Sequence, residues 1–115
     1  MSHQSFEDLE VWKRSCRLAV DVYRAMRDCR DYGLRDQMQR SAVSVPSNIA
    51  EGSERTRKDF IRFLRIAIGS AAELRTQCYI ACEVGLLERK HQSAFVQETK
   101  ELSRMMQALI RRLEA

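Results

Sequence analysis

The sequence predicts an all-α protein, an antiparallel up-down-up-down four-helix bundle formed by a single domain over residues 1–115. Three observations predict it. Apolar residues recur every three or four positions in four long segments. The chain has only 4 Gly and 1 Pro, too few turn residues for a sandwich or barrel with many hairpins. Its 115 residues suit one domain, and 44% hydrophobic residues are enough for a core.

The first helix is expected from about Phe6 to Cys29, with Ser5 as its N-cap. Two apolar stripes lie side by side along it and give a wide apolar face. The main stripe is Leu9, Trp12, Cys16, Ala19, Tyr23 and Met26, and the second is Val11, Leu18, Val22 and Ala25.

The second helix is expected from Tyr32 or Leu34 to Glu51, ending at Gly52 and Ser53. Its apolar seam is Leu34, Met38, Ala42, Val45 and Ile49. Pro46 lies inside this pattern and removes one backbone donor. Two shorter helices are the alternative, but the seam keeps its phase across Pro46 and favours one kinked helix.

The third helix is expected to start after a Thr56 cap, with Asp59 at its third position, and to run to about Val84. Its seam is Phe60, Leu64, Ala67, Ala71, Leu74, Cys78 and Ala81. Small residues cluster around Gly69, and we expect a close backbone approach there because Gly inside a helix is unfavourable. Gly85 follows as the terminating glycine.

The fourth helix is expected from about Glu88 to Leu113. Its seam is Phe95, Leu102, Met106, Leu109 and Leu113, while Met105 and Ile110 lie outside it. Apolar positions in excess of one small bundle's core, on the first and fourth helices, predict a further interface. The bundle is expected to be a rod with its connections at the two ends.

A second register of helix two is polar. Its members are Gln37, Ser41, Ser44, Asn48 and Glu51, and helix three offers Ser70, Glu73 and Gln77. A hairpin turn near Glu54 is expected to bring Arg35 and Gln37 close to Glu73 and Ala71. One interpretation is a solvated face. The other is a hydrogen-bonded seam inside the bundle or at a subunit interface, which the small serines favour.

Basic residues gather toward the predicted rod ends, in a chain of net charge +4. Arg55, Arg57, Lys58, Arg111 and Arg112 are expected at one end, and Arg27, Arg30, Arg89 and Lys90 at the other. These residues are the nucleic-acid-binding candidates, since clustered cations bind phosphates. The alternative is ordinary solubility, because acidic residues are interleaved throughout.

The pattern carries no positive case for an enzyme: we expect no catalytic residues, no cofactor and no metal. Glu88-x-x-His91 is half of a di-iron signature, and His3 offers no second half. Cys16, Cys29, Cys78 and Cys82 are expected to be reduced structural residues. The start of the chain lacks a signal-peptide pattern, and no apolar run is long enough to span a membrane, so a cytoplasmic location is expected.

Four sequence runs carry a family resemblance. They are Phe6-x-x-Leu9-x-Val11-Trp12, Tyr32-Gly33-Leu34-x-x-Gln37, the run from Arg40 to Gly52, and Phe60-x-x-Phe63-Leu64-x-x-Ala67-x-Gly69-Ser70-x-x-Glu73-Leu74. The most specific part is Ser44-Val45-x-x-Asn48-Ile49-Ala50-Glu51-Gly52. The chain resembles the four-helix-bundle proteins encoded in intervening sequences of bacterial 23S rRNA genes. That family also includes the accessory variability protein of diversity-generating retroelements.

The resemblance implies a bundle that assembles into a ring-like homopentamer and has a non-enzymatic role. It implies possible binding of RNA or DNA, and a possible protein partner such as a reverse transcriptase. The motif residues Asn48, Glu51, Gly52, Ser70 and Glu73 are assigned to helix ends, hairpin packing or the interface. The function expected is a homo-oligomeric nucleic-acid-binding accessory protein, and the alternative is a protein-interaction scaffold without nucleic-acid binding.

Overall fold

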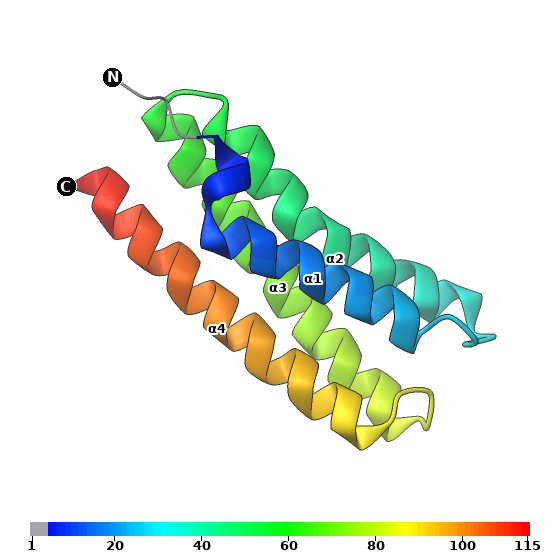
Figure 1. The fold of residues 1–115 in the computed structure, drawn as a ribbon. Helices are drawn as coiled ribbons and strands as arrows, with labels where there is room; N and C mark the ends of the chain where they lie inside the picture. Colours follow the sequence, from blue (N-terminus) through cyan, green and yellow to red (C-terminus); the bar gives the residue numbers. More distant parts are fainter. Residues whose placement is uncertain (1–4) are drawn as a thin grey trace.

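The computed structural model describes residues 5–115. A short 3-10 helix, η1 (Phe6–Asp8), precedes α1 (Glu10–Ala25), α2 (Tyr32–Ser53), α3 (Arg57–Glu83) and α4 (Arg89–Glu114). The four α-helices alternate in direction and form a rod of 50 × 19 × 19 Å (Figure 1). This confirms the all-α, four-helix fold.

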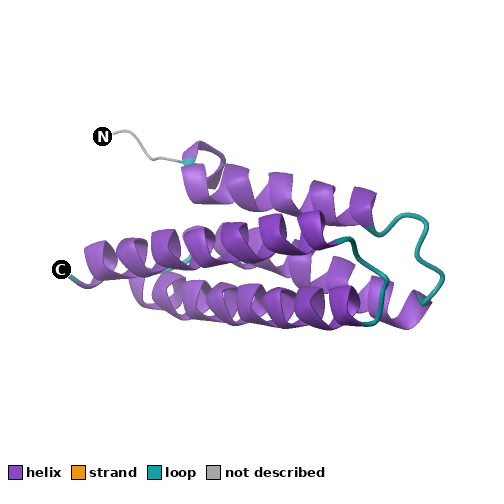
Figure 2. Cartoon of the chain, turned by 90° about the horizontal axis from the view of Figure 1, so that it is seen from below, coloured by secondary structure: helices purple, strands orange, loops and turns teal. Residues whose placement is uncertain are grey.

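All connections between helices lie at the two ends of the rod, as Figure 2 shows. The α2–α3 connection and the C-terminus share one end, which we call the α2–α3 end (Figure 1). The α1–α2 and α3–α4 connections share the other, which we call the α3–α4 end. Residues distant in sequence therefore meet at each end.

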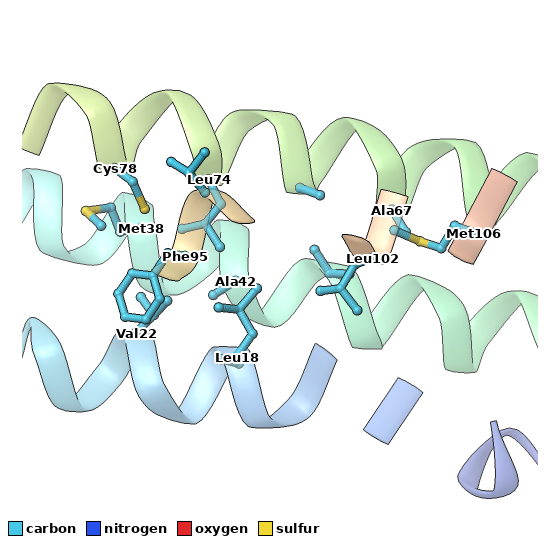
Figure 3. Packing of buried hydrophobic residues seen from close by; sticks show 14 of the residues in the cluster. Leu18, Val22, Met38, Ala42, Ala67, Leu74, Cys78, Phe95, Leu102 and Met106 are labelled. Atoms are coloured by element: carbon cyan, nitrogen blue, oxygen red, sulfur yellow. The ribbon is translucent and has the colours of Figure 1, made fainter. Parts of the chain in front are cut away.

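The core runs along the whole rod axis and is built from all four helices (Figure 3). The fully buried side chains include Val22, Met38, Leu74, Leu102 and Met106. The expected seams of α2, α3 and α4 are confirmed, with Leu34, Phe60 and Leu113 partly buried at their ends. Ile110, placed outside the α4 seam from the sequence, is buried, so that part of the predicted apolar excess was wrong.

The first helix does not run unbroken from Phe6 to Cys29 as predicted. Ser5 caps η1, its Oγ accepting from the Glu7 amide at 3.2 Å, and Leu9 is extended before α1 begins. The Phe6 ring packs edge-on against Trp12, with centroids 5.1 Å apart, so the chain folds back at this break. At its other end α1 ends at Ala25, and residues 26–31 connect it to α2.

The buried face of α1 takes residues from both predicted stripes, and Ala19 and Met26 of the main stripe are buried. Val11, Leu18 and Val22, from the second stripe, are buried. Ser15 lies between them and donates its hydroxyl to the Val11 carbonyl, which satisfies a polar group inside the core. Tyr23, from the predicted main stripe, is 47% exposed. Two adjacent stripes look alike in sequence, and the positions of α2 and α4 decide which residues of each stripe are covered.

Helix α2 is continuous through Pro46, which confirms one helix over two. Pro46 removes one hydrogen bond from the helix. Its ring is buried. Two residues later, Asn48 Nδ2 donates to the Ser44 carbonyl at 2.8 Å and to Ser44 Oγ at 2.9 Å.

The α2–α3 turn follows the predicted capping but not the predicted register. Thr56 Oγ1 accepts from the Asp59 amide at 3.2 Å, as expected for the cap of α3. Ser44 and Ser70 hydroxyls lie 2.8 Å apart. In an antiparallel pair with residue 44 opposite residue 70, Gln37 lies nearer residue 77 than Ala71.

The physical reason for this offset is Gly52, which lies in the last turn of α2 rather than after it. A Cβ at Gly52 would lie 2.6 Å from Cβ of Phe63 and 3.1 Å from Cδ1 of Phe60. The absence of a side chain lets α3 pass close by and extend beyond the end of α2.

The predictions for Gly85 and Gly69 had different outcomes. Gly85 has φ +82° just beyond α3 and is the terminating residue, as predicted. Gly69 is exposed, and within residues 5–115 a Cβ there would meet no atom of another helix within 4 Å. The close approach predicted at Gly69 is therefore not made by any described part of this chain.

Candidate nucleic-acid interface

The two ends of the rod hold the predicted basic residues in the grouping expected. Arg55, Arg57 and Lys58 follow α2 at the α2–α3 end, where α4 also brings Arg111 and Arg112 (Figure 1). Arg27 and Arg30 lie between α1 and α2 at the α3–α4 end, where Arg89 and Lys90 begin α4. The antiparallel fold thus joins residues that are far apart in sequence.

Most of these cations are exposed and have no carboxylate partner. Arg55 is the exception, since its Nη2 lies 2.9 Å from Glu51 Oε2. Within residues 5–115, the other eight candidates form no ion pair at 4.0 Å or less; they are Arg27, Arg30, Arg57, Lys58, Arg89, Lys90, Arg111 and Arg112. Their charge is available to a ligand.

Two of the helices begin with a pair of basic residues. Arg57 and Lys58 are the first two residues of α3, and Arg89 and Lys90 are the first two of α4. A helix N-terminus carries partial positive charge, so cations there are unfavourable and anions are favoured. Asp59 offsets the pair in α3, and the acidic residue at the start of α4 is its N-cap, Glu88. The fold places positive charge where its own stability disfavours it.

Further cations on α3, not predicted from the sequence, extend the α2–α3 end. A groove of about 650 Å³ is lined by Lys58, Arg62, Arg65 and Ile66 of α3, together with Asp59, Ile61 and Glu114. Arg65 Nη2 lies 3.2 Å from Glu114 Oε2. The spacing of residues 58, 62 and 65 puts these cations on one helix face, which was the signal available in the sequence.

The Phe63 ring contacts two arginines near the α2–α3 connection. The guanidinium carbons of Arg55 and Arg62 lie 5.1 and 4.8 Å from the Phe63 ring centre, within the range of a cation–π contact. Glu51 and Asp59 pair with these arginines at 2.9 and 3.8 Å. Arg55 and Arg62 are therefore positioned by the fold and partly neutralised.

The polar stripe is divided between interior and surface. Ser41 and Ser70 are buried, and Ser44 joins Ser70 and Asn48 in a hydrogen-bonded cluster between α2 and α3. Gln37, Glu51 and Glu73 are exposed. The stripe's centre is thus a seam inside the bundle, and its ends face solvent.

Arg14 and Glu98 join α1 to α4 in a paired contact away from the basic ends. Two guanidinium nitrogens of Arg14 donate to the Glu98 carboxylate at 3.0 and 2.7 Å. This hydrogen bonding, opposed by partial burial, raises the pKa of Arg14. The pair is structural, and its charge is not free for a ligand.

The four cysteines and His91 do not form a metal-binding group within the described residues. The four thiols are free, and burial raises the pKa of Cys78 to about 12. The His91 ring stacks on Phe95 with centres 5.9 Å apart, and its Nε2 lies 3.9 Å from Glu88. Residues 5–115 contain no group of three or more His, Cys, Asp or Glu side chains placed to hold a metal. His3 lies outside the described residues.

The helices differ from membrane-spanning segments in length or in apolar character. Over residues 5–115, none is both long enough and apolar enough to cross a bilayer.

Comparison with known proteins gives a family and a fold. The family model described as 23S rRNA-intervening sequence protein matches residues 7–108. A crystal structure from Bacteroides thetaiotaomicron, of a protein with unknown function from the S23 ribosomal protein family, superposes with a TM-score of 0.81. The two chains are 22% identical, and the match covers 87% of this chain and 97% of the other. The search of curated proteins found no match. The chain belongs to the 23S rRNA-intervening sequence protein family, whose model covers nearly all of it.

Proposed function

We propose that this chain is a non-enzymatic accessory protein that assembles into a ring-like homo-oligomer, a homopentamer, and binds RNA or DNA through phosphate contacts. The observation that carries the nucleic-acid part is the basic pair at the start of both α3 and α4. Each pair adds cations to a helix end whose backbone amides already favour an anion.

The energetic argument separates this proposal from ordinary solubility. Each cation at a helix N-terminus costs about 0.3–1 kcal/mol at a surface site. A chain that needed charge only for solubility would lose nothing by placing Arg57, Lys58, Arg89 and Lys90 in the middle of an exposed helix. A phosphate at either end removes the penalty, because it interacts favourably with both the amides and the side chains.

The contact proposed is to the phosphate backbone and not to bases. The candidates at both ends are exposed arginines and lysines, whose side chains typically contact phosphate oxygens. Binding is therefore expected to be weakly selective for sequence and strongly dependent on salt.

The test is a titration of fluorescently labelled single-stranded RNA and duplex DNA at several salt concentrations. R57Q/K58Q and R89Q/K90Q remove one basic pair each. R17Q/K100Q removes two exposed cations from the middle of α1 and α4 and serves as the matched control. Each basic-pair variant is expected to bind about tenfold more weakly and to reduce the salt slope by roughly 1.5–2.

The same variants have an expected stability readout that a solubility role does not predict. R57Q/K58Q should unfold at higher urea concentration than the natural protein, because the unfavourable interaction with the helix dipole is removed. Loss of binding with a gain of stability supports the proposal. Equal binding by the basic-pair variants and the control, or no binding to either nucleic acid, contradicts it.

The alternative function is a scaffold that presents a surface to a partner protein, such as a reverse transcriptase. It is distinguished by a protein that co-purifies with the chain and stays bound after nuclease treatment, while R57Q/K58Q has no effect on that complex.

A further inference from the structure

The outer faces of the rod carry two surfaces that match one another in charge and apolar character. The first is a groove between α1 and α2, which we call the α1–α2 groove. It consists of two adjoining hollows of about 510 and 490 Å³ that share Tyr23, Gln39 and Val43. Val20 and Tyr23 are 47% exposed and Val43 is 40% exposed, so the groove has an uncovered apolar floor.

The rim of the α1–α2 groove is basic. Arg24, Arg27 and Arg40 line it and form no ion pair with the carboxylates of residues 5–115. The one rim carboxylate, Asp36, is already paired with Arg35 at 3.3 Å. An occupant of this groove would need apolar side chains flanked by acidic ones.

The second surface is the solvent-facing side of α3, which we call the α3 stripe. It consists of Ile66, Gly69, Glu73, Thr76, Ile80 and Glu83, all exposed and spaced so that they lie on one helix face. Ile66 and Ile80 are large exposed hydrophobics. Glu73 and Glu83 are acidic, and neither is ion-paired in the described part of the chain. The stripe has the composition that the α1–α2 groove requires.

The two surfaces also lie at the same level along the rod. Because Ser44 of α2 is opposite Ser70 of α3, the groove residues 36–43 of α2 are level with residues 71–78 of α3. Glu73 lies within that range. A second copy can therefore be placed beside the first without sliding along the rod axis.

Gly69 gives the stripe a third property. Within the described chain, a Cβ at this position meets no atom of another helix within 4 Å, yet Gly inside a helix is less stable than Ala. An adjacent helix from another molecule could approach the α3 backbone closely here, because no side chain intervenes.

We propose that the α1–α2 groove of one molecule binds the α3 stripe of a second copy. Different surfaces meet in this contact, so each copy keeps one groove and one stripe for further neighbours, and the assembly closes into a ring when the rotation permits. This inference rests on the self-association part of the proposed function and assigns its interface.

The test exchanges the charges of the two surfaces and measures mass by light scattering. R24E/R40E reverses the groove, E73R/E83R reverses the stripe, and a third protein combines all four changes. K13E/K100E changes net charge as much as R24E/R40E but lies outside both surfaces. We expect the natural protein, the control and the fourfold variant to be multimers, and each single-surface variant to be a monomer.

The fourfold variant is decisive because its groove and stripe are complementary again with reversed signs. A fourfold variant as dissociated as R24E/R40E overturns the inference, as do single-surface variants that assemble normally. A monomeric natural protein removes both this inference and the self-association part of the proposed function. A natural multimer that is insensitive to R24E/R40E and E73R/E83R removes the inference alone.

Gly69→Gln provides a test that does not depend on charge. Gln has a higher helix propensity than Gly and occupies open space in the single chain, so the variant should fold with a higher unfolding midpoint. Its side chain would block the close approach, so the variant should be monomeric. Assembly of Gly69→Gln at the natural mass overturns the contact at the α3 stripe.

Discussion

At the scale of single residues, Gly52 and Gly69 occupy opposite environments inside helices. A Cβ at Gly52 would lie 2.6 Å from Phe63 Cβ, whereas a Cβ at Gly69 meets no atom of another described helix within 4 Å. We expect Gly52→Ala to destabilise the chain by about 1–3 kcal/mol through overpacking. Gly69→Ala is expected to stabilise it by up to about 1 kcal/mol. Urea unfolding of both variants at low protein concentration, where self-association is minimal, measures the two effects; equal effects would contradict this account of Gly52.

Cys78 gives a pH-dependent prediction at the same scale. Burial raises the pKa of its thiol from 9.0 to about 12, so between these values the unfolded chain ionises while the folded chain keeps the proton. This contribution to the free energy of unfolding is complete below pH 9 and is lost as pH rises toward 12. The free energy of unfolding of the natural protein should therefore fall more steeply from pH 8 to pH 10 than that of Cys78→Ala. Equal pH slopes would contradict the shift.

Residue roles differed in how far the sequence could define them. Gly52 was recognised as special from its place at the end of a helix, but its contact with Phe63 depends on the position of α3. The Ser44–Ser70 bond was foreseen only as one of two interpretations of the polar stripe. A helical repeat shows which residues share a face, and only the neighbouring helix determines whether that face is buried.

At the scale of elements, the start of α3 is fixed by Thr56. Its hydroxyl accepts from the Asp59 amide at 3.2 Å and satisfies one of the free donors of the helix. Thr56→Ala should destabilise the chain by about 1 kcal/mol, and Thr56→Ser should retain most of the stability. Thermal unfolding of the pair checks this; an equal loss in both variants would show that the methyl group, and not the cap, is responsible.

Element boundaries were predictable where a local signal sets them. Thr56 and Gly85 bound α3, and both signals act within a few residues. The break between η1 and α1 was missed because it depends on the packing of Phe6 against Trp12. The α2–α3 register was missed for a similar reason, since it is set by contacts between helices and not by the length of the turn.

At the scale of the whole molecule, four helices of matched pattern fixed the topology, because short connections leave antiparallel neighbours as the simple arrangement. The grouping of basic residues at two ends followed from that topology. The α1–α2 groove could not be foreseen, because the sequence suggested that Tyr23 belonged to the buried stripe of α1. Its exposure is a consequence of how α1 is rotated against α2.

The measurement that tests the central claim most directly is light scattering on a size-exclusion column at low and high salt, with absorbance recorded at 260 and 280 nm. We expect a discrete multimer that carries nucleic acid at low salt and sheds it at high salt, since phosphate contacts weaken with salt while the apolar parts of the interface do not. A monomer free of nucleic acid under both conditions would contradict both the assembly and the binding that we propose.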